Sequence, residues 1–170
     1  MNRRLLLLRH AKSDWDTDAP GDFERPLAKR GRRDAPRIGQ WLSERPELHP
    51  GLVIASPAER ARETVVLVLE TIGGDKVDIT WDQRIYGASP GELIEVLKEV
   101  PAETGSVMLL GHNPGLEQLL GILCPDVEMS AGGKLFPTGT LAYIQLAGHF
   151  ADLEPGTGVL EKIIRPRELD

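Results

Sequence analysis

Two kinds of hydrophobic pattern follow one another along the chain. Short runs that are uniformly apolar or alternating predict strands, and the uniform runs indicate strands buried on both faces of a sheet. Longer segments with apolar residues every three or four positions predict helices. The predicted strands cover residues 3–9, 51–56, 77–81, 106–110, 141–146 and 159–164. The predicted helices cover residues 28–44, 57–73, 89–100 and 116–123.

The order of these segments predicts the fold class. Strands that alternate with helices of this length are typical of a three-layer α/β/α sandwich around a mostly parallel central sheet. Ser56 and Pro57 are expected to cap and open the second helix, and a glycine pair at 73–74 to end it. Residues 11–27 are rich in turn formers and predict a long loop over one end of the sheet. At this length we expect residues 1–170 to form one domain.

Composition narrows the class of protein. Apolar residues make up 41% and charged residues 27% of the chain, a balance typical of soluble globular proteins. No apolar run approaches the roughly 20 residues that span a bilayer, and Arg9 and His10 interrupt the N-terminal leucines before a signal-peptide core forms. We therefore expect a cytoplasmic protein without a membrane segment. A single cysteine, Cys124, allows neither an intramolecular disulfide nor a multi-cysteine metal site.

The charge is unevenly distributed. The net charge of −6 argues against a nucleic-acid partner, yet residues 1–37 hold ten Lys or Arg against six Asp or Glu. A cluster that contains Arg9, Lys12, Arg25 and Arg30 would attract an anion such as phosphate, although a solvated basic face explains the same counts.

Polar residues of types that take part in catalysis lie at the ends of predicted strands. His10 follows the first strand, Ser56 the second and His112 a later one. Ligands of open α/β sheets bind beyond the carboxyl ends of the strands. We therefore expect these three positions to converge at one edge of the sheet.

The residue types at these positions suit phosphoryl transfer. That reaction needs an in-line nucleophile and cationic donors around the phosphoryl oxygens, and a neutral imidazole such as that of His10 can attack phosphorus without a metal. Arg60 lies near the predicted start of a helix, where backbone amides also favour an anion. His112 would stabilise charge on the transferring group. Taken singly, each of these residues is explained as well by a surface salt bridge or a capping role.

No metal or other cofactor is expected. The four histidines, His10, His49, His112 and His149, show no close ligand spacing such as H-E-x-x-H. A metal hydrolase is therefore the weaker alternative.

Taken together, the motifs resemble the histidine phosphatase superfamily, also called the phosphoglycerate mutase-like family. The segments that carry the resemblance are Leu8-Arg9-His10-Ala11, Ser56-Pro57-x-x-Arg60-Ala61-x-x-Thr64, Gly111-His112-Asn113 and Arg25-Pro26-Leu27-x-x-Arg30-Gly31. The form Arg9-His10-Ala11-Lys12-Ser13 and the short length are similar to the SixA-type phosphohistidine phosphatases.

The resemblance implies a phosphoglycerate mutase-like fold and a set of roles. His10 would be the nucleophile, while Arg9, Arg60 and His112 would bind the phosphoryl group. Asn113 would line the same pocket. Residues 136–140 match a loop that this branch places near the site, although a plain turn explains them equally well.

The chain departs from the mutase pattern at Ala11 and Lys12, where glycine and glutamate are usual, so mutase activity is not expected. The insertion that carries the proton donor of larger members is also missing. Glu92 and Asp82 are candidate donors by position only, and each is also explained as a helix-start or surface carboxylate. A missing acid matters less for phosphohistidine, whose P–N bond is labile, than for a phosphate ester.

The leading hypothesis is therefore a metal-independent phosphatase that acts on phosphohistidine in a phosphorylated protein. A phosphatase for a small phosphorylated metabolite would use the same residues and remains an alternative. A non-catalytic phosphate-binding module is a third hypothesis. The presence of all four core residues, Arg9, His10, Arg60 and His112, argues against it.

Overall fold

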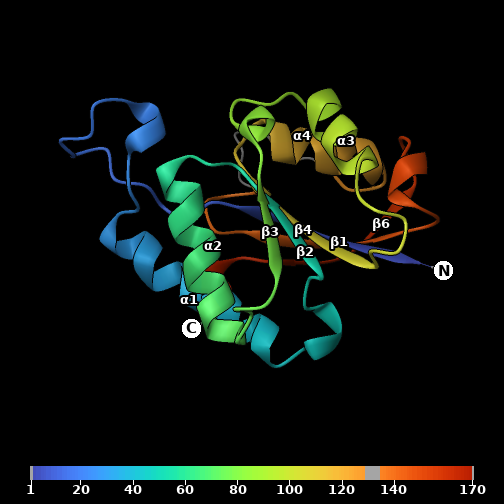
Figure 1. Cartoon of the computed structure of the whole chain (residues 1–170), viewed down its shortest axis with the longest axis horizontal. Helices are drawn as coiled ribbons and strands as arrows, with labels where there is room; N and C mark the ends of the chain where they lie inside the picture. Colours follow the sequence, from blue (N-terminus) through green and yellow to red (C-terminus); the bar gives the residue numbers. More distant parts are fainter. Residues whose placement is uncertain (1, 129–134, 170) are drawn as a thin grey trace.

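The computed structural model describes residues 2–128 and 135–169, which form a six-stranded sheet covered on both faces by helices (Figure 1). The strands are β1 (Arg3–Arg9), β2 (Leu52–Ala55), β3 (Asp78–Trp81), β4 (Ser106–Gly111), β5 (Leu141–Leu146) and β6 (Gly158–Ile164). The helices are α1 (Lys29–Ser43), α2 (Glu59–Ile72), α3 (Pro90–Lys98) and α4 (Gly115–Leu123). All six strands and four helices lie where the hydrophobic pattern predicts them.

The sheet has the strand order β3-β2-β4-β1-β5-β6. Neighbouring strands from β3 to β1 run parallel, and β5 is antiparallel to both of its neighbours. The expected three-layer sandwich with a mostly parallel sheet is therefore confirmed. No helix in the described part of the chain is both long and apolar enough to cross a membrane.

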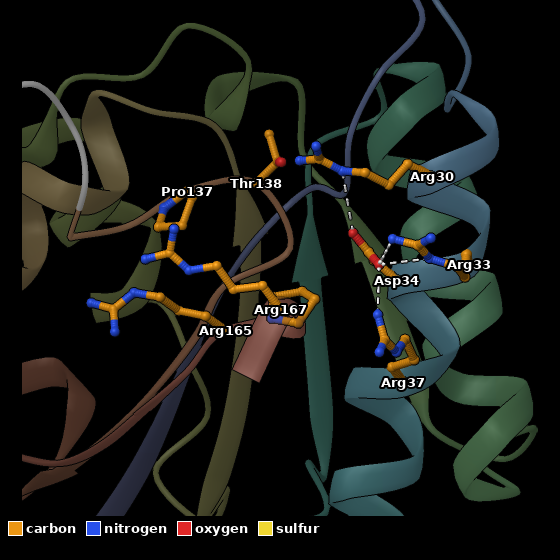
Figure 2. A pocket seen from close by; sticks show the side chains of 9 residues that line it. Arg30, Arg33, Asp34, Arg37, Pro137, Thr138, Arg165 and Arg167 are labelled. Carbon is orange, nitrogen blue, oxygen red and sulfur yellow. Dashed lines mark hydrogen bonds and ion pairs between the residues drawn. The ribbon is translucent and has the colours of Figure 1, made fainter. Parts of the chain in front are cut away.

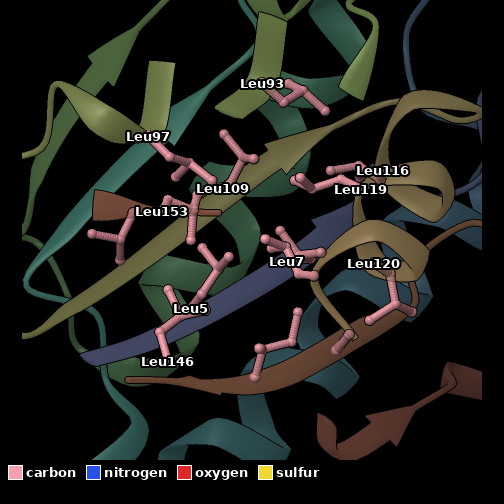
Figure 3. Packing of buried hydrophobic residues seen from close by; sticks show 14 of the residues in the cluster. Leu5, Leu7, Leu93, Leu97, Leu109, Leu116, Leu119, Leu120, Leu146 and Leu153 are labelled. Atoms are coloured by element: carbon pink, nitrogen blue, oxygen red, sulfur yellow. The ribbon is translucent and has the colours of Figure 1, made fainter. Parts of the chain in front are cut away.

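Strand β1 supplies both layers of the core. Successive strand residues point to opposite faces of a sheet, and Leu5 and Leu7 join the apolar cluster beneath α3 and α4 (Figure 3). Leu6 and Leu8 join the cluster beneath α1 and α2. All four leucines are fully buried. Because both faces of the strand are covered, its sequence is apolar at every one of these positions instead of alternating.

The predicted cap of α2 is wrong. The helix begins at Glu59 with Ala58 in the N-cap position, and Pro57 lies outside it. The Ser56 hydroxyl accepts a hydrogen bond from the Ala58 amide at 3.2 Å, so it closes a local turn ahead of the helix. Arg60 is consequently the second residue of α2. The expected end of the helix is confirmed, because Gly73 adopts a left-handed conformation with φ of 68°.

Helix α1 approaches the segment after β1 very closely at Gly31. A Cβ atom built on Gly31 would overlap the Lys12 carbonyl oxygen. The Ala28 amide donates a hydrogen bond to that same oxygen at 2.8 Å. Glycine at this position therefore lets the start of α1 pack directly on the chain that follows His10.

We predict that Gly31→Ala lowers the free energy of unfolding by about 1–3 kcal/mol, the usual cost of overpacking. Gly91→Ala is the matched control, because it also lies in the first turn of a helix but its Cβ would have 3.9 Å of clearance. Helix propensity predicts that this control is neutral or stabilising by up to about 1 kcal/mol. Urea unfolding of both variants measures the difference, and equal effects would contradict the packing argument.

Candidate active site

Three neighbouring strands bring the predicted residues together. Strands β2, β4 and β1 are adjacent in the sheet, and their carboxyl ends lead into Ser56, His112 and His10 respectively. The His10 and His112 ring centroids lie 5.1 Å apart, and His112 Nε2 lies 2.8 Å from the Ser56 hydroxyl oxygen. The predicted convergence at one edge of the sheet is confirmed.

His10 is held as a neutral imidazole with one defined tautomer. Its Nδ1 lies 2.7 Å from the Ala11 carbonyl oxygen, and because a carbonyl can only accept, Nδ1 carries the proton. Burial lowers the pKa of His10 to about 3, with smaller contributions from His112, Arg60 and Arg9, against the opposing effect of the Ala11 hydrogen bond. Near pH 7 the ring is therefore uncharged and its Nε2 lone pair is available.

Two site residues are anchored to one backbone carbonyl. The Phe136 oxygen accepts hydrogen bonds from Arg9 Nη1 at 3.1 Å and from Asn113 Nδ2 at 3.0 Å. The Gly139 amide donates to the His10 carbonyl oxygen at 2.9 Å. Residues 136–140 therefore lie directly beside the candidate site.

Arg60 is paired with a carboxylate that the sequence did not single out. Arg60 donates to the Asp22 carbonyl oxygen at 2.8 Å and to its Oδ2 at 3.1 Å. Tyr86 donates its hydroxyl proton to the same Oδ2 at 2.6 Å. This bond from Tyr86, followed by those from Arg25 and Arg60, lowers the pKa of Asp22 to about 2. The carboxylate paired with Arg60 is therefore ionised near pH 7.

His112 is also neutral. Burial and the nearby charge of Arg60 lower its pKa to about 4. The Ser56 hydroxyl already accepts a hydrogen bond from the Ala58 amide, so the arrangement that satisfies both groups has Ser56 donating to His112 Nε2. That arrangement places the ring proton on Nδ1.

Three nitrogens of the site are buried without a partner in the described part of the chain. Arg9 Nε, Arg60 Nε and His112 Nδ1 are buried and have no hydrogen-bond partner among the described residues. Buried polar groups are normally satisfied, and an unmatched set at one place is typical of a site that binds a ligand. Donors from two guanidinium groups and an imidazole suit a tetrahedral oxyanion.

The two candidate proton donors have other, local partners. Glu92 accepts a hydrogen bond from the Ser89 amide at 3.0 Å and completes the capping box of α3. Asp82 pairs with Arg84 at 2.7 Å. Each of these contacts favours the ionised carboxylate and lowers its pKa.

Asp22 and Tyr86 were missed by sequence reasoning. Asp22 lies in the long loop 11–27, whose density of turn formers marks it as a loop but does not distinguish one aspartate from another. Tyr86 contacts the His112 ring edge-on at 5.5 Å, and no local pattern points to it. In the described ranges, no group of three His, Cys, Asp or Glu side chains is positioned to hold a metal ion.

The fold and this set of residues define an α/β protein with a site suited to a phosphoryl group. A profile of the histidine phosphatase superfamily (branch 1) matches residues 5–108, and the chain belongs to this superfamily. It is also 34% identical over 166 residues to an uncharacterized protein of Mycobacterium tuberculosis, covering 94% of this chain and 100% of the relative.

Solved structures give the same assignment. A putative phosphohistidine phosphatase SixA from Nakamurella multipartitia superposes with a TM-score of 0.81 at 28% identity and covers 98% of this chain and 97% of its own. The putative SixA from Agrobacterium tumefaciens gives 0.79 at 29% identity, covering 96% and 98%. A phosphoglycerate mutase from Bacillus anthracis gives 0.72 at 14% identity, covering 99% and 95%, and shares the fold. The resemblance to the SixA branch is confirmed.

Acid should destabilise the protein through His10. Its folded pKa of about 3 lies below the unfolded value of about 6.5, so between these pH values the unfolded chain binds a proton that the folded chain does not. Stability is therefore lost as pH falls below about 6.5. We expect His10→Gln to reduce the loss in unfolding free energy between pH 7 and pH 5 by roughly 2 kcal/mol relative to wild type. Urea unfolding at both pH values tests this, and identical losses would contradict a buried neutral His10.

Asp22 competes with an incoming anion for Arg60. Removing its charge with Asp22→Asn should strengthen the binding of inorganic phosphate by about two- to fivefold, the scale of a partly exposed ion pair. Phosphate titration followed by the imidazole NMR signals of His10 and His112 measures binding at this site. Asp82→Asn is the matched control and should leave the affinity unchanged. A weaker affinity in Asp22→Asn than in wild type would refute the competition.

Proposed function

We propose that this chain hydrolyses phosphohistidine on proteins and that His10 carries the phosphoryl group between the two steps of the reaction. The observation that supports this most directly is the neutral, singly protonated His10 ring beside three buried nitrogens that have no hydrogen-bond partner among the described residues. The SixA neighbours point to the same substrate class.

In the first step, His10 Nε2 attacks phosphorus while the bond between phosphorus and the substrate's imidazole nitrogen breaks. Arg9, Arg60 and His112 Nδ1 donate to the three equatorial oxygens, where charge accumulates. When Arg60 donates to the phosphoryl group, its hydrogen bond to the Asp22 carboxylate weakens or breaks. The product is His10 phosphorylated at Nε2. Its Nδ1 keeps its proton and still donates a hydrogen bond to the Ala11 carbonyl oxygen.

In the second step, water attacks phosphorus, the P–N bond to His10 breaks, and inorganic phosphate leaves. Because Nδ1 keeps its proton, the His10 ring departs as a neutral imidazole and is ready for another cycle. The hydrogen bond to Ala11 therefore makes His10 a nucleophile in one step and a leaving group in the next.

The site favours phosphohistidine over an ester. An alkoxide leaving group needs a proton donor, whereas a phosphohistidine protonated on its second ring nitrogen releases neutral imidazole. Asp22 is ionised, and both Glu92 and Asp82 hold local partners. The side chain of Asp22 is also 47% exposed, and Trp15 in the same loop is 72% exposed, which suits a site that a protein-borne histidine can enter.

The test compares phosphate release from a chemically phosphorylated histidine protein and from an aryl phosphate, with EDTA present. For wild type we expect faster turnover of the phosphohistidine protein. His10→Ala should lower the rate at least about a thousandfold, as the loss of a covalent nucleophile does, and His149→Ala is the matched histidine control outside the site. Labelled enzyme quenched during turnover should carry an acid-labile, base-stable phosphate that is absent from His10→Ala.

Each result has a definite meaning. Good turnover of aryl phosphate with slow release from the phosphohistidine protein would retain the His10 mechanism and transfer the assignment to small phosphorylated metabolites. Phosphate release that persists in His10→Ala, or that EDTA abolishes, would refute the mechanism itself.

A further inference from the structure

A basic pocket lies beside the candidate active site. It is a cavity of about 260 Å³ lined by Arg30, Arg33, Asp34, Arg37, Pro137, Thr138, Arg165, Pro166 and Arg167 (Figure 2). Its lining comes from three separate parts of the chain: helix α1, the 137–138 segment and the residues after β6. We call it the arginine pocket. The proposed phosphatase chemistry uses none of its side chains.

One carboxylate organises the α1 side of the arginine pocket. Asp34 is buried and lies 3.6 Å from Arg30 Nε, 3.4 Å from Arg33 Nε and 3.3 Å from Arg37 Nη1 (Figure 2). A guanidinium group offers up to five donors, so one shared carboxylate cannot engage every donor of Arg30 and Arg33. Arg33 keeps 65% of its side chain exposed despite the contact.

The opposite wall carries two more arginines. Arg165 donates to the Leu135 carbonyl oxygen at 2.9 Å, which fixes its guanidinium group, and it pairs with Glu168 at 3.4 Å. Arg167 is exposed, and within the described ranges no hydrogen bond or ion pair engages it. Figure 2 shows both side chains across the pocket from the three arginines of α1.

Charge and size together indicate the kind of ligand. Five arginines line the arginine pocket and Asp34 is the one carboxylate in its lining, so the wall of the cavity is strongly basic. The cavity is smaller than the roughly 300–1,000 Å³ typical of drug-sized ligands. Arginine forks match phosphate oxygens in pairs. A concave pocket of this size also suits a small anion better than a flat, acidic protein surface.

We propose that the arginine pocket binds a small anion that carries two or more linked phosphoryl groups, either free or attached to an organic molecule. This site is distinct from the His10 site. The 137–139 segment separates the two, since Pro137 and Thr138 line the arginine pocket while the Gly139 amide donates to the His10 carbonyl oxygen.

Calorimetry with tripolyphosphate at low ionic strength tests the proposal. Wild type should bind tripolyphosphate at least tenfold more tightly than inorganic phosphate. Arg33→Glu/Arg167→Glu should weaken tripolyphosphate binding at least tenfold, because it reverses two exposed charges on opposite walls. Arg32→Glu is the matched control: Arg32 is exposed on the same helix but does not line the pocket, and its affinity should stay within threefold of wild type. Arg33→Gln/Arg167→Gln provides the same test if the double glutamate variant loses its circular dichroism or melting transition.

A variant of the other site separates the two locations. Arg60→Ala alters the His10 site and should leave tripolyphosphate binding to the arginine pocket intact. Loss of binding in Arg60→Ala with retention in Arg33→Glu/Arg167→Glu would overturn the proposal, as would equal losses in Arg32→Glu and the double variant. Absence of binding to wild type would also overturn it.

Equal affinity for a nucleoside triphosphate and tripolyphosphate would show that the phosphate chain alone is recognised, and tighter binding of the nucleotide would add a contact to its organic part.

Discussion

The burial of β1 on both faces is the constraint on which the rest of the structure depends. Its leucines supply apolar contacts to the helix pairs above and below the sheet, so the strand must lie in the interior, between β4 and β5. An interior strand delivers the residue that follows its last position to the carboxyl edge of the sheet. His10 is that residue, and its 6% exposure follows from the position of the strand that precedes it.

This position sets the electrostatics of the site. A histidine buried near two arginines is disfavoured as a cation, both because it has lost hydration and because neighbouring positive charges repel a proton. The same two effects act on His112. The site thus combines permanent positive charge on Arg9 and Arg60 with two uncharged imidazoles. Such a combination attracts an anion while it keeps the proposed nucleophile unprotonated.

The 136–140 loop links features that are far apart in sequence. Its Phe136 carbonyl holds Arg9 and Asn113, and its Gly139 amide contacts the backbone of His10. Pro137 and Thr138 of this loop line the arginine pocket, so the loop borders both the candidate active site and that pocket. The loop requires Gly139, because φ is +77° there and a Cβ would also collide with Pro166.

The sequence by itself determined the strands, the helices and the convergence of His10, Ser56 and His112, because hydrophobic periodicity and strand ends are local properties of the chain. It did not determine that Ser56 would bond to His112 instead of capping α2, since a serine before a proline satisfies the same local pattern in either role. Asp22, Tyr86 and the arginine pocket were decided only by the tertiary structure. Their partners are separated by tens of residues or more, and packing of a loop, a helix and the segment after β6 around one sheet edge brings them together.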